Sequence, residues 1–284
     1  MSADAYENPL TGRYASPEMS ALFSARHKFA TWRRLWLWLA ESERELGLAI
    51  PEAALEALRA RLVPTDAELA SAERHERETK HDVMAQIHAL GEVAPEARPY
   101  IHLGATSAFV GDNADLLVLR DALRLLERRA ARVLARLAAF ARERKDLACV
   151  GYTHFQAAQP TTVGKRACLW VQDLVLDLQE LSARAEGLRF LGCKGATGTQ
   201  ASFVALFGGD GAKADLLDRK VAGKAGFPRR LLISGQTYTR KQDALVLSAL
   251  SGLAASASKF AHDLRLLQHM KEVEEPFGSK QVGS

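Results

Sequence analysis

The chain has 284 residues, of which 48% are apolar and 25% charged, enough for one large or two smaller domains with a sizeable core. The net charge of +4 is mild, and basic residues alternate with acidic ones, which favours solvated helix faces over a nucleic-acid surface. Three cysteines without a CxxC pair (Cys149, Cys168 and Cys193) suit a reducing compartment and argue against a disulfide framework or a zinc site.

We recognise no targeting signal in the sequence. Residues 1–7 lack a basic region followed by an apolar run, and no uninterrupted stretch of about 18 apolar residues occurs along the chain. We therefore expect a cytoplasmic protein without a signal peptide, a membrane span or a membrane partner.

The first part of the chain reads as helices. Ser16 can cap a helix that has Pro17 at its first position, and the helix or helix pair that follows runs to about Leu46, with Gly47 as its stop. A further short helix runs from Pro51 to about residue 62, and one or two helices occupy residues 66–94. Four residues recur on one face of the first helix and predict core packing: Trp32, Leu35, Trp36 and Leu39.

Three long helices are predicted over residues 112–145, 160–189 and 241–271, each with an apolar stripe that needs antiparallel partners. Between the helices lie irregular polar segments, at residues 100–111, 146–159, 191–210 and 227–240. The fold class is therefore all-α. We place a small helical N-terminal domain at residues 1–111 and a central long-helix bundle at residues 112–284.

The polar segments carry the candidate chemistry. His154 lies between two helices, and the usual imidazole pKa near 6.5 suits proton transfer, although a loop histidine can equally be a hydrogen-bonded surface residue. Thr106 and Ser107 follow Gly104 and could hold a carboxylate, or could simply cap a turn.

Other chemistries find no support. His81 and His88 lack the further ligands of a metal set, and residues 194–200 lack the order of a phosphate loop. Histidine, hydroxyl and amide groups remain, without a metal or cofactor. This set suits proton abstraction and donation in an elimination reaction.

Five motifs occur in an order that resembles the adenylosuccinate lyase family of the fumarase/aspartase superfamily. A sibling such as the argininosuccinate lyases is a lesser alternative, because the first two motifs argue against it. The resemblance covers essentially the whole chain and rests on Arg13–Glu18, Lys80–Ala85, His102–Ser107, Thr153–Gln156 and Gly235–Tyr238.

The resemblance implies a homotetramer with an all-α long-helix bundle, in which three subunits build each active site without a cofactor. The substrates would be adenylosuccinate, which yields AMP and fumarate, and SAICAR, which yields AICAR and fumarate. It further implies that His154 is the general acid and Ser284 the general base. The substrate-binding residues would be Arg13 and Tyr14 for the phosphate, Lys80, His81 and Asp82 on the nucleotide side, Thr106, Ser107 and Gln236 for the succinyl carboxylates, and Thr153 beside His154.

By the same resemblance, the chain ends at Ser284 inside the catalytic signature of the family, so the bundle is expected to be truncated. Two readings stay open. The chain is part of a longer enzyme, or it is a short, catalytically inactive helical form that associates with full-length subunits. In either case we expect the isolated 284-residue chain to show no detectable turnover.

Overall fold

The structure, a computed structural model, describes residues 8–282 and divides them into two compact units. Residues up to Ala122, together with Ala185–Arg240, form unit 1. Leu123–Arg184, together with the residues from Lys241 on, form unit 2. The helix α6 (Ser107–Glu143) belongs to both units and includes Gly111, so the division at residues 111 and 112 stays a prediction.

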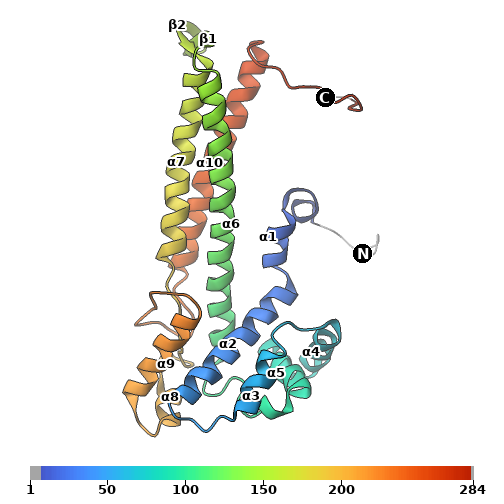
Figure 1. The fold of residues 1–284 in the computed structure, drawn as a ribbon, viewed down its shortest axis with the longest axis vertical. Coiled ribbons are helices and arrows are strands. Elements are labelled where there is room, and N and C mark those ends of the chain that lie inside the picture. Colours follow the sequence, from blue (N-terminus) through green and yellow to red (C-terminus); the bar gives the residue numbers. More distant parts are fainter. Residues whose placement is uncertain (1–7, 283–284) are drawn as a thin grey trace. The chain divides into compact units, whose positions relative to one another are not determined.

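Unit 1 is helical, and two of its helices start at side-chain caps, of which the cap at Ser16 was predicted. Ser16 Oγ accepts a hydrogen bond from the amide of Met19, and Thr65 forms a reciprocal capping box with Glu68. The elements of unit 1 besides the start of α6 are η1 (Leu10–Tyr14), α1 (Pro17–Leu22), α2 (Ala25–Glu45), α3 (Glu52–Arg59), α4 (Asp66–Thr79), α5 (Asp82–Val93), η2 (Pro95–Ala97), α8 (Ala201–Leu206) and α9 (Gly211–Lys224) (Figure 1).

The predicted apolar face of α2 lies in the core of unit 1. Trp32, Leu35, Trp36 and Leu39 are each at most 2% exposed, which confirms the interpretation of these residues as core. Gly47 has a φ of 104°, which explains why the helix stops there: glycine adopts the left-handed region without a steric penalty.

Unit 2 consists of the remainder of α6, a β-hairpin and two further long helices, α7 (Val163–Gly187) and α10 (Lys241–His269). These helices lie side by side in Figure 1, with the hairpin at one end. Their shared core is small and is centred on Ala141, Ala167, Trp170 and Leu267. The expectation of a mostly helical fold with long helices is confirmed.

The hairpin corrects two details of the sequence analysis. Residues 146–159 were expected to be irregular and Pro160 to open a helix. Instead β1 (Ala148–Thr153) pairs with β2 (Gln156–Thr162), and Pro160 lies opposite Val150. The threonines after Pro160 favour a strand, and the Thr162 hydroxyl caps α7 by accepting a hydrogen bond from the amide of Lys165 at 3.1 Å.

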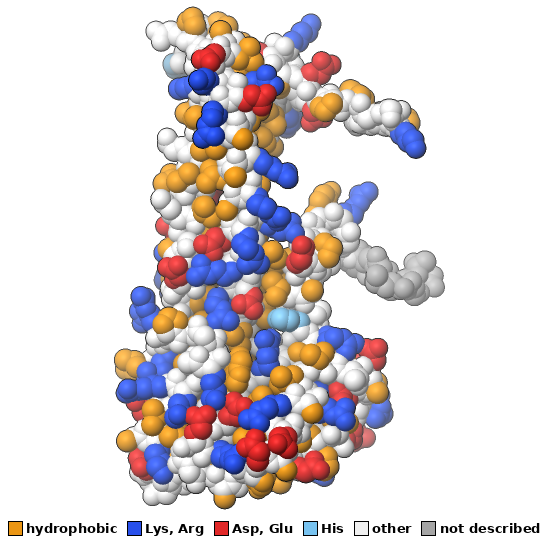
Figure 2. All heavy atoms as spheres, viewed as in Figure 1, with side chains coloured by type: hydrophobic (Ala, Val, Ile, Leu, Met, Phe, Trp, Pro, Cys, Tyr) orange, Lys and Arg blue, Asp and Glu red, His pale blue; other side chains and the backbone are white. Residues whose placement is uncertain are grey.

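The helix α10 is long and apolar enough to cross a membrane by length and composition alone, although only 11% of the qualifying stretch is buried. A single such helix is weak evidence, because a helix that packs against other helices has a similar composition. Figure 2 shows hydrophobic side chains between Lys and Arg on the surface of the long helices. Apolar residues exposed on unit 2 include Val133, Leu169, Leu176 and Leu247.

Candidate active site

His154 lies at the tip of the hairpin in unit 2. Thr153 pairs with Gln156, so His154 and Phe155 are the two central residues of the turn. Their φ angles are 52° and 58°, as in the type I′ turns that match the twist of a two-residue hairpin. Neither residue is glycine or asparagine, so the turn is conformationally costly, a feature that clusters at functional sites.

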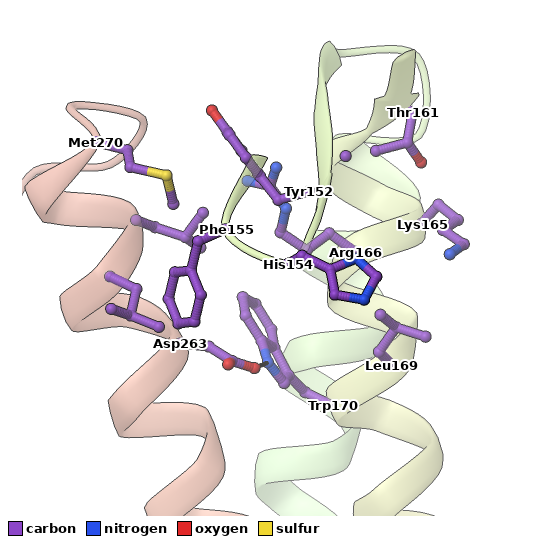
Figure 3. Close-up of a pocket in the computed structure, with 13 residues that line it drawn as sticks. Tyr152, His154, Phe155, Thr161, Lys165, Arg166, Leu169, Trp170, Asp263 and Met270 are labelled. Atoms are coloured by element: carbon purple, nitrogen blue, oxygen red, sulfur yellow. Dashed lines mark hydrogen bonds between the residues drawn. The ribbon is translucent and has the colours of Figure 1, made fainter. Parts of the chain in front are cut away.

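The turn borders a pocket of about 410 Å³ that lies entirely within unit 2. Figure 3 shows His154 on the side of α7, above Trp170, and Phe155 on the side of α10. The lining is mixed, with apolar, aromatic, cationic and acidic side chains. The lining residues that matter here are Tyr152, His154, Phe155, Lys165, Arg166, Trp170, Asp263 and Met270.

Hydrogen bonds fix the walls of this pocket. The Trp170 indole donates to Asp263 Oδ2 at 2.8 Å, and Asp263 also lies 3.7 Å from Lys259 Nζ. Near the rim, Arg166 donates from Nη1 to Glu272 Oε2 at 2.5 Å. The pocket is therefore a pre-formed cleft with an imidazole at its mouth.

Thr106 and Ser107 are located at the start of α6 in unit 1. The Thr106 hydroxyl is buried and has no hydrogen-bond partner among the described residues, which leaves it available to a ligand. Gly104, with a φ of 68°, brings the chain close to α8, where a Cβ atom would lie 2.6 Å from Leu206 Cδ1. The Ser202 hydroxyl donates to the carbonyl of Gly104 at 2.6 Å and fixes this turn.

His102, in the same segment, is a neutral imidazole. Burial, and to a smaller extent the charge of His81, lower the pKa of His102 to about 4. The unprotonated Nδ1 accepts a hydrogen bond from the Trp36 indole at 2.9 Å. This ring therefore supports the 102–107 segment and does not supply a proton at neutral pH.

Gln236 belongs to a segment that is held at the same end of α6. The amide of Tyr238 donates to Asp112 Oδ2 at 2.7 Å, and Arg240 Nη2 donates to Asp112 Oδ1 at 3.1 Å. Asp112 follows Ser107 by little more than one helical turn, so the structure brings the two predicted carboxylate-binding segments to one end of one helix.

The predicted nucleotide-side residues lie at the junction of α4 and α5, also in unit 1. Lys80 caps α4 with a φ of 54°, and the His81 Nδ1 atom accepts a hydrogen bond from the amide of Met84 at 3.3 Å. Asp82 lies 3.7 Å from Lys28 Nζ in an ion pair that is half exposed. Arg13 and Tyr14 are exposed in η1.

The predicted residues therefore fall into two sets. Unit 1 carries the segments of Thr106, Ser107 and Gln236 together with the α4–α5 junction, and unit 2 carries Thr153 and His154. Ser284 lies outside the described residues. Within residues 8–282, no three His, Cys, Asp or Glu side chains are placed to hold a metal ion.

Sequence reasoning missed several residues around His154. Trp170 lies in the helix predicted over residues 160–189 and counted only as part of its apolar stripe, and Tyr152, Arg166, Asp263 and Glu272 were given no role. Their contacts join residues about a hundred positions apart, for example Tyr152 and Glu272, so no local sequence pattern indicates them. The positive φ angles at the turn likewise have no sequence signal, because the turn lacks an Asn-Gly pair.

Comparison with known proteins identifies the class of this fold. The profile of the lyase family matches residues 14–284, and the chain belongs to this family. A lactonizing enzyme for 3-carboxy-cis,cis-muconate from Pseudomonas putida superposes with a TM-score of 0.79 at 28% identity, over 92% of this chain and 58% of that one. A fumarate lyase from Mesorhizobium sp. BNC1 gives the same score and identity, over 91% and 59%.

The curated relatives narrow the class. Adenylosuccinate lyase from Saccharomyces cerevisiae is 51% identical over 99% of this chain, and the one from Schistosoma mansoni is 48% identical over 98%. The chain is thus a homologue of adenylosuccinate lyases, as the motifs indicated. It spans 58% of the length of both relatives.

Proposed function

We propose that this chain supplies part of an active site that eliminates fumarate from adenylosuccinate, giving AMP, and from SAICAR, giving AICAR, in purine nucleotide synthesis. The observation that carries the proposal is the 51% identity to the Saccharomyces cerevisiae adenylosuccinate lyase across nearly the whole chain. The hairpin turn with His154 at a pocket mouth supports it, because the reaction needs a proton donor that reaches the substrate.

The elimination removes one proton from carbon and breaks one C–N bond. A base takes the proton from the succinyl β-carbon, the electron pair forms the double bond of fumarate, and the C–N bond breaks. The leaving nitrogen then takes a proton from an acid. We assign the acid to His154, whose imidazole is exposed and borders the pocket. By family resemblance we assign the base to Ser284.

The succinyl carboxylates are assigned to Thr106, Ser107 and Gln236, with Thr153 as a further contact beside the acid. The unpartnered Thr106 hydroxyl supports this assignment, since a buried hydroxyl without a partner is costly unless a ligand satisfies it. Ser107 opens α6, where amide groups without helical partners favour an anion.

The nucleotide end of the substrate is assigned to the exposed residues of unit 1. Arg13 offers a guanidinium that can grip a phosphate with two hydrogen bonds, and Tyr14 offers a hydroxyl. Lys80, His81 and Asp82 would line the base and ribose. Their position at a helix junction supports this role, because irregular segments between rigid helices commonly carry binding residues.

We further propose a cytoplasmic homotetramer in which three subunits complete each site, without a metal or cofactor. The apolar side chains that unit 2 exposes support an oligomer: Leu176 and Leu247 are 57% and 64% exposed. Monomeric proteins rarely leave long apolar stripes open to water.

The test is a fusion in which residues 1–284 replace the matching part of the Saccharomyces cerevisiae relative. We expect the fusion to cleave adenylosuccinate and SAICAR, and the isolated chain to release no fumarate. In the fusion, His154→Ala should lower kcat by about 10²–10⁴, the usual contribution of a general acid. Absorbance at the wavelength where adenylosuccinate and AMP differ gives the rate.

The matched control is His262→Ala, an exposed histidine of α10 that does not line the pocket. Alanine is well tolerated in a helix, so this variant should keep its rate. A folded tetrameric fusion without activity, or equal rates for the two histidine variants, would overturn the assignment.

A further inference from the structure

The chain reverses direction sharply where α10 ends. The amide of Lys271 donates to Gln268 O and the amide of Glu272 donates to Leu267 O, both at 2.9 Å, the hydrogen-bond pair of a Schellman motif. Lys271 has a φ of 60° at the position where glycine is usual. This costly turn places Glu272 where its side chain contacts the hairpin and α7.

Glu272 joins three elements of unit 2 at this point. Its Oε1 accepts a hydrogen bond from the Tyr152 hydroxyl at 2.8 Å, and its Oε2 accepts one from Arg166 Nη1 at 2.5 Å. Arg166 Nη2 in turn donates to the carbonyl of Val150 at 2.6 Å. We call Tyr152, Arg166 and Glu272 the hairpin clamp. Figure 3 shows Tyr152 pointing from the hairpin to the side of the pocket formed by α10.

The clamp acts where the hairpin is irregular. The register shifts between Val150 and Tyr152, so that Gly151 of β1 lies opposite two residues of β2, Ala158 and Gln159. Such a bulge increases the local twist of the two strands, here directly beside Tyr152. A Cβ atom on Gly151 would lie 3.0 Å from the carbonyl of Gln159, so the close approach at the bulge suits glycine.

The hairpin needs outside support to keep its turn. A lone two-stranded hairpin is marginally stable in water, and most residues of β1 and β2 are exposed. The turn also holds two non-glycine residues at positive φ, which the surrounding contacts must outweigh. Tyr152 precedes His154 by only two residues, so a contact at Tyr152 directly limits where the imidazole can lie.

We propose that Glu272 is a positioning residue for His154, which it holds at the pocket mouth through the Tyr152 hydroxyl and through Arg166. The catalytic meaning of this role rests on the proposed function. The geometric role of Glu272 does not depend on the proposed function, because the clamp links the turn to α7 and to the end of α10 whatever the substrate is. Loss of Glu272 would leave the fold of the helices intact and let the turn move.

The first experiment measures amide exchange by mass spectrometry in the 284-residue chain. In Glu272→Gln, the amides of residues 148–162 should exchange about tenfold faster, the loss expected for charge-assisted hydrogen bonds. The helical amides of α7 and α10 should be unchanged. Tyr152→Phe removes one hydroxyl, keeps the ring, and should give a smaller effect in the same direction.

The control is Glu274→Gln, which removes the same charge two residues away from an exposed position. Hairpin exchange in this variant should match the wild type. The His154 ring signal in a two-dimensional NMR spectrum, assigned with His154→Ala, should shift in Glu272→Gln and stay in place in Glu274→Gln. Equal exchange and equal His154 signals in the two variants would overturn the proposal.

The catalytic readout uses the fusion defined above. Glu272→Gln should lower kcat about 10- to 100-fold and leave KM within about twofold, because a misplaced acid slows the chemical step without removing a substrate contact. Faster hairpin exchange with an unchanged kcat would refute positioning. A wild-type fusion without activity would overturn the proposed function alone, since exchange and NMR test the clamp independently.

Discussion

The polar loops of unit 1 and the hairpin of unit 2 are both held in a defined position, but by different interactions. In unit 1, Asp218 is 1% exposed and its carboxylate accepts hydrogen bonds from Lys194 Nζ at 2.6 Å, from Arg230 Nε at 2.8 Å and from the amide of Cys193 at 2.8 Å. In unit 2, the exposed hairpin depends on the clamp. Fully buried charges impose one geometry on a loop, whereas a few part-buried contacts to an exposed hairpin leave a segment that can open at low cost.

Close backbone packing accompanies the buried charges of unit 1. Gly192 has a φ of 87°, and a Cβ atom there would lie 1.8 Å from Asp218 Oδ1. Gly198 has a φ of 80°, and a Cβ atom there would lie 1.9 Å from the carbonyl of Ser234. Both positions therefore require glycine, and the second brings its loop against the segment that carries Gln236.

The largest expected effect tests the buried network. Asp218→Ala should lower the free energy of unfolding by about 3–5 kcal/mol, because it leaves Lys194 and Arg230 without their shared carboxylate in a buried site. Urea denaturation measures the change. Amide exchange in the hairpin should not change, if the two regions are held independently.

Asp215→Ala is the matched control, since this carboxylate also pairs with Arg230 but its side chain is 40% exposed. Its loss should cost at most about 1 kcal/mol. Equal losses for the two aspartates would mean that burial does not distinguish the loops of unit 1 from the hairpin.

A second effect, of opposite sign, concerns Glu43, a buried carboxyl of α2 whose two oxygens have no partner within the described residues. Burial raises the pKa of Glu43 from 4.5 to about 9. Between these pH values the folded chain holds a proton that the unfolded chain has released. The free energy of unfolding therefore falls as pH rises through this window, by up to about 1.4 kcal/mol per pH unit.

Glu43→Gln should remove this slope and stabilise unit 1 at pH 7 by on the order of 3 kcal/mol, measured as denaturation midpoints between pH 5 and pH 9. Glu45→Gln provides the contrast. Glu45 accepts hydrogen bonds from Lys220 and Lys224, which lower the pKa of Glu45, so this variant should be neutral or slightly destabilised. A retained slope in Glu43→Gln would show that another group titrates.

Sequence reasoning reached the parts of the molecule that local physics determines. The caps at Ser16 and the stop at Gly47 were predicted because a side-chain oxygen or a missing Cβ acts within one turn of a helix. The hairpin was missed because His154 and Phe155 are not turn formers, and contacts across the chain hold their positive φ angles. The Asp112–Tyr238 bond, which anchors the Gln236 segment, spans 126 residues and is equally invisible to local patterns.

The candidate site likewise contains residues that local sequence indicates and residues that only distant contacts place. The polar segments between helices marked His154 and Thr106 as candidates, and resemblance to a family supplied their roles and the other motif residues, since each motif is a short run that can be matched one residue at a time. The supporting residues did not stand out. Trp170 was assigned to the core, which it does join, but its bond to Asp263 was unforeseen because it depends on how α7 packs against α10.

The smallest expected effect bears on the strain that places the clamp. Lys271→Gly should stabilise the chain by about 0.5–1 kcal/mol, because glycine adopts the left-handed conformation at φ 60° without the Cβ clash that lysine suffers, less the extra freedom glycine has when unfolded. Lys271→Ala removes the same charge but keeps a Cβ atom, and should give no gain.

A gain in both variants would point to the charge of Lys271 and not to its backbone. A gain in the glycine variant alone, with hairpin exchange unchanged, would show that the reversal carries strain while Glu272 still holds Tyr152. The two regions would then differ in a further respect. The left-handed residue beside Asp218 in unit 1 is a glycine, Gly192, whereas the left-handed residue beside Glu272 in unit 2 is a lysine.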